Sequence, residues 1–148
     1  MKSILFICLG NICRSPLAQG IAEKIIRDQK LNIKVDSAGT GDWHIGEAPC
    51  ENSVRVAAIN GVDISAQLAR QVQADDFAAF DLIIALDQSN HENLKKMGAV
   101  NPIKLGYFGY DNEDVPDPFF FPGYEGFERV YTMIETCVTR LLKEKTGP

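Results

Sequence analysis

The chain has 148 residues, a normal length for one globular domain and a short one for two. Its 45% hydrophobic and 24% charged residues are typical of a folded domain in water. The net charge of −5 argues against nucleic-acid binding and against an anionic membrane surface, because both need a basic field. No stretch is long enough to insert into a membrane, and residues 1–9 lack a signal-peptide cleavage pattern, so we expect a cytoplasmic protein with reduced cysteines.

The first third of the chain predicts a strand, a tight loop, a helix and a second strand. Ser3–Ile7 is a short apolar run without polar alternation, which is typical of a strand buried on both faces. Pro16 suits the first turn of a helix. Apolar residues then recur at helical spacing until about Lys30. Ile33–Ser37 alternates as a second strand does.

The remainder of the chain continues the alternation of helices and strands. The predicted elements are a helix from Pro49 to Gly61, a helical turn at Asp75–Phe80, a buried strand at Asp81–Leu86, a helix capped by Asp87, an edge strand at Pro102–Leu105 and a helix from Phe127. This order predicts a single α/β domain over residues 1–148, with a four-stranded parallel sheet and helices on both faces. Between the last two elements lies Gly106–Gly126, a loop so long that we expect it to be functional.

The loop after the first strand carries the clearest chemical signal. In open α/β sheets, ligands bind beyond the carboxyl ends of the strands. Here Cys8 is followed six positions later by Arg14, and the helix begins directly afterwards. Gly10 and Asn11 tolerate left-handed dihedrals, so the backbone amides between them can converge on a tetrahedral anion. A helix N-terminus and a guanidinium stabilise a thiolate, which makes Cys8 a candidate nucleophile facing a bound phosphate.

The segment Cys8–Pro16 (CLGNICRSP) resembles the signature of the low-molecular-weight protein tyrosine phosphatases. Further family-like features are spread over nearly the whole chain: Asp36-Ser37-Ala38-Gly39, Asp42-Trp43, Ala69-Arg70-Gln71, Asp87-Gln88-Ser89-Asn90 and Asp117-Pro118. The larger tyrosine phosphatases share the cysteine–arginine spacing but place a histidine where this chain has Ile7. The resemblance implies that the loop after the first strand binds phosphate.

The resemblance also implies a role for the long loop. Ester cleavage needs a proton donor for the leaving oxygen, and the acidic side chains in that loop do not by themselves single one out: Asp111, Glu113, Asp114 and Asp117. The family takes the proton from an Asp-Pro pair, here Asp117-Pro118. By resemblance, Cys8, Arg14 and Asp117 are catalytic, and Trp43 with Phe119 or Phe120 walls the pocket. The family often has tyrosines at the latter two positions, whereas this chain has phenylalanine at both. Regulation by phosphorylation of those tyrosines is therefore excluded.

The rest of the predicted site lies in the first loop. The residues expected to contact substrate there are Leu9, Gly10, Asn11, Ile12, Cys13 and Ser15. The family suggests that Asn11 holds the loop in shape through Ser15 and Ser37. A histidine commonly assists before Ala69, but this chain has Gln67, which leaves that part of the network open.

The four cysteines divide into three expected classes. Cys8 is the nucleophile. Cys13 is either a redox partner, since related enzymes can join the two sulfurs of this loop, or a packing residue beneath it. Cys50 and Cys137 fall in predicted helices and are expected to be inert. His44 and His91 are expected at the surface, and no residue set has the spacing of a metal site, so no metal or cofactor is expected.

We therefore predict a monomeric enzyme that hydrolyses phosphotyrosine in proteins, and small aryl phosphates, through a cysteinyl-phosphate. An arsenate reductase of the same fold would need a resolving cysteine pair around residues 80–90, and the chain has none there. A phosphoarginine phosphatase tends to carry threonine where this chain has Ile12. A phosphate-binding module without activity would not need Asp117. These three remain the alternatives.

Overall fold

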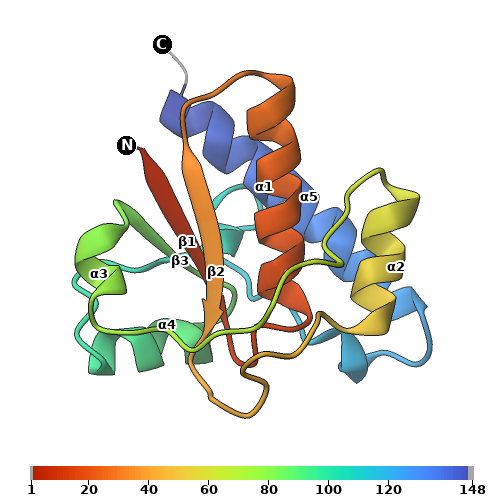
Figure 1. The fold of residues 1–148 in the computed structure, drawn as a ribbon, viewed down its shortest axis with the longest axis horizontal. Helices are drawn as coiled ribbons and strands as arrows, with labels where there is room; N and C mark the ends of the chain where they lie inside the picture. The colour runs from red at the N-terminus through yellow and green to blue at the C-terminus, as the bar shows by residue number, and fades with distance from the viewer. Residues whose placement is uncertain (1, 147–148) are drawn as a thin grey trace.

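The computed structural model describes residues 2–146 as a sheet covered by helices on both faces (Figure 1). The four strands are β1 (Ser3–Cys8), β2 (Lys34–Gly39), β3 (Leu82–Ala85) and β4 (Ile103–Lys104). They are all parallel and lie in the order β2-β1-β3-β4. The predicted four-stranded parallel α/β fold is therefore confirmed.

The helices follow the predicted order with small changes at their ends. They are α1 (Arg14–Asp28), α2 (Glu51–Ile59), α3 (Asp76–Ala79), α4 (Gln88–Lys96) and α5 (Glu125–Thr146). Two short 3₁₀ turns, Leu105–Tyr107 and Pro118–Phe120, lie within the segment between β4 and α5. Across residues 2–146, every helix is too short or too polar to cross a bilayer.

The sheet separates two apolar clusters because successive residues of β1 point to opposite faces. Ile4 and Phe6 pack with α1, α2 and α5, whereas Leu5 and Ile7 pack with Phe80 and α4. All four of these β1 side chains are fully buried, which explains why the strand has no polar alternation. Figure 1 shows the resulting layers, with α1 and α5 on one side of the strands and α3 and α4 on the other. The central position of β1 places the loop after Cys8 between the loops that follow β2 and β3.

Candidate active site

Cys8 is the last residue of β1 and lies opposite Gly39, the last residue of β2. Its Sγ accepts a hydrogen bond from the backbone N–H of Asn11 at 3.2 Å and lies 3.0 Å from the Ser15 Oγ. Asn11 has a φ of +58°, the left-handed conformation predicted for it, and this turns its N–H back toward the sulfur. A Cβ on Gly39 would come within 2.7 Å of the Leu9 carbonyl oxygen, so only glycine lets the loop pass this close to β2.

Asn11 holds the loop through three side-chain hydrogen bonds and is only 3% exposed. Its Nδ2 donates to Ser15 Oγ (2.8 Å) and Ser37 Oγ (2.9 Å), and its Oδ1 accepts from the backbone N–H of Arg70 (3.0 Å). Because the Ser15 hydroxyl accepts from Asn11, its own proton is free to point at the Cys8 sulfur. A hydroxyl donor aimed at that sulfur favours the thiolate. The Asn11–Ser15–Ser37 contacts are those that the family resemblance implied.

Arg14 begins α1 and is fixed by two acceptors on its Nη1. That atom donates to Asp87 Oδ2 at 2.7 Å and to the carbonyl oxygen of Val115 at 2.8 Å. The other oxygen of Asp87 accepts from the backbone N–H of Asn90 and so caps α4, as predicted for this aspartate. Because Arg14 is only 7% exposed and its guanidinium is anchored through one nitrogen, its other donors can meet an anion at little further entropic cost.

A cavity of about 200 Å³ brings the predicted catalytic groups together. Its lining residues are Cys8, Leu9, Gly10, Ile12, Cys13, Arg14, Trp43, His44, Asp117 and Phe119. Asn11, Ser15 and Ser37 do not line it but lie behind the loop, where they support its shape. The arrangement places a thiol, a guanidinium and a carboxyl group around one small space. These are the parts required for nucleophilic attack on a phosphoryl group with acid catalysis.

The long loop before α5 delivers Asp117 and one aromatic wall. Asp117 Oδ1 accepts from the backbone N–H of Phe119 at 2.9 Å, which fixes the start of the Pro118–Phe120 turn. The Phe119 ring packs edge-to-face against buried Phe127 of α5, with ring centroids 5.3 Å apart. Trp43, from the loop after β2, lines the same cavity and is 68% exposed. Two flat side chains therefore flank the opening above Cys8.

The other candidates from this loop lie elsewhere. Asp114 Oδ1 forms an ion pair with Lys104 at 2.7 Å and accepts from the backbone N–H of Gln88, and neither Asp111 nor Glu113 lines the cavity. Phe120 is 80% exposed and borders a neighbouring hollow instead of the cavity that contains Cys8. Of the two phenylalanines considered for the wall, the structure places Phe119 there.

Comparison with known proteins agrees with this geometry. Residues 3–146 match the profile of the low molecular weight phosphotyrosine protein phosphatases. The chain belongs to that family. It is 41% identical to the low molecular weight protein-tyrosine-phosphatase YfkJ of Bacillus subtilis, over 96% of this chain and 94% of that one.

Solved structures resemble this phosphatase over its whole length. A protein tyrosine phosphatase from Entamoeba histolytica superposes with a TM-score of 0.89 at 32% identity, covering 99% of each chain. A Drosophila arginine phosphatase, DARP, superposes with a TM-score of 0.90, also at 32% identity and 99% coverage of each chain. The fold is thus shared by members named for different phosphorylated residues.

The cysteines of this phosphatase depart from expectation at one point. A disulfide joins Cys13 to Cys50, with their Cα atoms 5.3 Å apart, so the expectations that all thiols are reduced and that Cys50 is inert are wrong. Cys50 lies just before α2 and its backbone N–H donates to the Ile12 carbonyl oxygen at 2.7 Å, which brings it beside the loop. Cys8 and Cys137 are free. Burial raises the pKa of Cys137 to about 11, although the charge of Arg140 opposes this shift.

Three residues of the phosphatase site gain roles that sequence reasoning missed. Asp87 was predicted only as a helix cap, yet it also holds Arg14, 73 positions away in sequence. Arg70 presents its backbone N–H to Asn11 while its side chain binds Asp76 through both terminal nitrogens at 3.0 and 3.1 Å. His44, expected at the surface, lines the cavity and lies 3.0 Å from Glu47 through Nδ1. The sequence shows the family-like motifs that contain Asp87 and Arg70, but it does not show which residues those side chains contact.

Gln67 lies in the segment before Ala69, where the family resemblance implied a histidine. Its Nε2 donates to the carbonyl oxygen of Pro16 at 3.1 Å, so it ties its segment to the first turn of α1. The contact to Asn11 comes instead from the backbone of Arg70. Among residues 2–146, no group of three or more His, Cys, Asp or Glu side chains could hold a metal ion.

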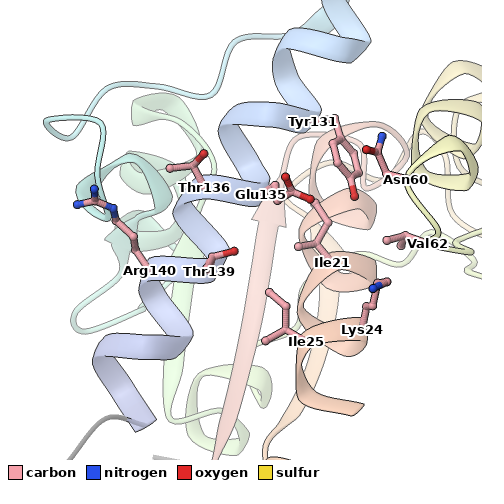
Figure 2. A pocket seen from close by; sticks show the side chains of 10 residues that line it. All are labelled: Ile21, Lys24, Ile25, Asn60, Val62, Tyr131, Glu135, Thr136, Thr139 and Arg140. Atoms are coloured by element: carbon pink, nitrogen blue, oxygen red, sulfur yellow. The ribbon is translucent and has the colours of Figure 1, made fainter. Parts of the chain in front are cut away.

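A second, larger cavity of about 410 Å³ lies between α1, α5 and the segment after α2 (Figure 2). Figure 2 shows charged and hydroxyl side chains around it, among them Lys24, Glu135 and Arg140. It shares no lining residue with the cavity around Cys8 and contains no thiol. The smaller cavity is therefore the candidate active site, despite its size.

Proposed function

We propose that this phosphatase hydrolyses phosphotyrosine in proteins, and small aryl phosphates, through a phosphorylated Cys8. The observation that carries the proposal is the meeting of Cys8, Arg14 and Asp117 in one cavity of about 200 Å³. Flat walls at Trp43 and Phe119 suit an aromatic ring, which stacks on aromatic side chains. Relatives named protein-tyrosine phosphatases at 41% and 37% identity support the same substrate class.

Substrate binding would use the loop amides and Arg14. The phosphoryl oxygens accept hydrogen bonds from backbone N–H groups between Leu9 and Arg14, at the N-terminal end of α1. Arg14 contributes the donors that Asp87 and Val115 do not occupy. The phosphorus atom then faces the Cys8 sulfur, and the tyrosine ring passes between Trp43 and Phe119 to the surface.

The reaction has two steps in this proposal. The Cys8 thiolate attacks phosphorus, the P–O bond to the ring breaks, and Asp117 gives its proton to the departing phenolate oxygen. In the second step the Asp117 carboxylate takes a proton from a water molecule, which attacks phosphorus and breaks the S–P bond. Arg14 and the loop amides stabilise the charge on the equatorial oxygens in both steps.

Ile12 bears on the choice between aryl and guanidine phosphates. Its aliphatic side chain lines the cavity, where the phosphoarginine phosphatases tend to have threonine. An apolar group there favours a phenyl ring over a polar guanidinium. We expect phosphotyrosine to be hydrolysed faster than phosphoarginine, and Ile12→Thr to shift the ratio of the two kcat/KM values toward phosphoarginine.

The function is tested by hydrolysis of aryl phosphates in the presence of a metal chelator. Cys8→Ser should abolish turnover while retaining phosphate or vanadate binding, and appreciable residual activity would refute the assignment of the nucleophile. Asp117→Asn keeps the hydrogen-bond acceptor for Phe119 but removes the acid. It should lower kcat by roughly 10²–10⁴-fold for poor leaving groups and far less for good ones.

Asp111→Asn is the matched control for the acid, because it makes the same chemical change in the same loop on an exposed side chain. It should leave kcat unchanged for both kinds of leaving group. Equal losses in the two variants would mean that another group donates the proton. Action in the cytoplasm and a monomeric state are also proposed, and cell fractionation and sedimentation test them.

A further inference from the structure

The Cys13–Cys50 disulfide lies directly beside the nucleophile but does not include it. Cys13 lines the same cavity as Cys8 and is five residues away on the same loop. Cys8 keeps its contacts to Asn11 and Ser15 while the disulfide is present. In this oxidised form the nucleophile therefore remains a free thiol in its place.

The two bonded cysteines are held together by contacts other than the disulfide. The backbone N–H of Cys50 donates to the Ile12 carbonyl oxygen at 2.7 Å, and the Ser53 hydroxyl donates to the Cys13 carbonyl oxygen at 3.1 Å. These bonds do not depend on the state of the sulfurs. The Cys50 thiol of the reduced protein therefore stays next to Cys13, where a short side-chain movement suffices for attack.

The positions of the two residues favour reaction between them. Cys13 is the residue before α1 and Cys50 the residue before α2, so each lies at the positive end of a helix, which stabilises a thiolate. Both are partly exposed, whereas Cys8 is 2% exposed. The pair is thus open to cellular reductants, and the nucleophile is enclosed.

We propose that Cys50 is the terminal resolving thiol of a three-cysteine relay that passes oxidation from Cys8, through Cys13, to the Cys13–Cys50 disulfide. The proposal rests on the assignment of Cys8 as the reactive nucleophile. Its co-reactant is a hydroperoxide small enough for the cavity, such as hydrogen peroxide. Its function is to restore the Cys8 thiolate without an external reductant.

The steps balance in atoms and electrons. The Cys8 thiolate attacks the hydroperoxide, which becomes an alcohol or water, and the sulfur becomes a sulfenic acid. Cys13 attacks the Cys8 sulfur, and the hydroxyl group leaves as water with the thiol proton. Cys50 then attacks the Cys13 sulfur and expels Cys8 as a thiolate, and the proton that the Cys50 thiol loses balances the one taken up by the alkoxide or hydroxide of the first step. Two thiols are oxidised and one hydroperoxide is reduced.

The last step has a preferred direction. In a mixed disulfide the sulfur that is more stable as a thiolate leaves faster. The Asn11 N–H and the Ser15 hydroxyl stabilise the Cys8 thiolate, so attack on Cys13 expels Cys8 and regenerates the nucleophile. Oxidation is then stored in a bond on the partly exposed side of the loop.

The test begins with the fully reduced protein and one equivalent of hydrogen peroxide. Wild type should keep most of its activity, and peptide mapping should find Cys13 joined to Cys50. Cys50→Ser should lose most of its activity, recover it with dithiothreitol and contain a Cys8–Cys13 disulfide. Cys137→Ala, which removes the other free thiol and one that does not line the cavity, should behave as wild type. Equal loss in wild type and Cys50→Ser would overturn the proposal.

A second measurement separates the relay from direct oxidation of the pair. Cys8→Ser removes the entry point, so the Cys13–Cys50 disulfide should form at least about tenfold more slowly with the same peroxide concentration. Formation at the wild-type rate would show that Cys8 takes no part and would overturn the relay. Because this readout is a disulfide and not turnover, it remains informative even if the phosphatase assay fails.

Discussion

Asn11 offers the most direct test of how the fold creates the site, because its side chain and its backbone conformation contribute separately. Asn11→Ala removes three buried hydrogen bonds and leaves a residue with a Cβ at a φ of +58°. Asn11→Gly removes the same bonds but tolerates that φ. The difference between the two variants therefore reports the backbone conformation, and their common loss reports the network.

The expected magnitudes follow from these contacts. Each hydrogen bond contributes about 1 kcal/mol, so both variants should lose about 3 kcal/mol of unfolding free energy. The left-handed conformation costs alanine about 1–2 kcal/mol, and the extra freedom of unfolded glycine offsets about 0.5–1 kcal/mol of that difference. Asn11→Ala should thus be less stable than Asn11→Gly by roughly 0.5–1 kcal/mol. Both should lose at least about tenfold in kcat/KM, since the N–H facing Cys8 is no longer fixed.

Urea unfolding and aryl phosphate kinetics measure these effects. Asn112 is the control, because it shares the left-handed conformation (φ 63°) but is exposed and, within residues 2–146, makes no side-chain hydrogen bond. Asn112→Ala should lose only about 1 kcal/mol of unfolding free energy, and its phosphatase activity should be unchanged. A loss below about 1 kcal/mol in Asn11→Gly would refute the claim that the Asn11 network stabilises the loop.

Three other predictions concern acid stability, thiol reactivity and the long loop. Burial raises the pKa of Asp76, but the hydrogen bonds from Arg70 and the Gln73 amide outweigh burial, so the pKa of this carboxyl lies below its ordinary value of 3.8. The Asp76 carboxylate therefore stabilises the fold above about pH 3.8. Asp76→Asn should lower the unfolding free energy at pH 7, and the difference from wild type should shrink as the pH falls below about 3.8, as acid titration of unfolding would show. With its pKa raised to about 11 by burial, Cys137 should resist iodoacetamide at pH 8 in the native protein, which peptide mapping after alkylation detects. Gly106→Ala would push a Cβ into the Glu113 carbonyl and should cost about 1–3 kcal/mol in urea unfolding.

The elements that the sequence predicted well are those encoded by local patterns. The buried run at Ser3–Ile7 and the capping aspartate at position 87 depend only on near neighbours, and both are found where expected. The edge strand predicted at Pro102–Leu105 shrinks to Ile103–Lys104, because pairing with β3 is limited to two residues there. Element ends depend on tertiary pairing, which a local pattern does not contain.

The candidate site shows the same division. Cys8, Arg14 and Asn11 lie within one loop, so their spacing and residue types were informative. The choice of Asp117 over its acidic neighbours needed the family resemblance. All four acidic residues lie in the same predicted loop, and nothing local in the sequence distinguishes one from another. The disulfide and the Arg14–Asp87 contact join residues 37 and 73 positions apart, and no local signal reports such pairs.

Asp87 constrains how this protein can vary. As a helix cap alone it could be replaced by serine, threonine or asparagine at little cost. Its second oxygen, however, neutralises and aims the buried Arg14, which none of those residues can do. Two separate requirements therefore apply to one residue, Asp87. A library of all substitutions at this position should return only aspartate when selected for activity, but several residues when selected for folding alone.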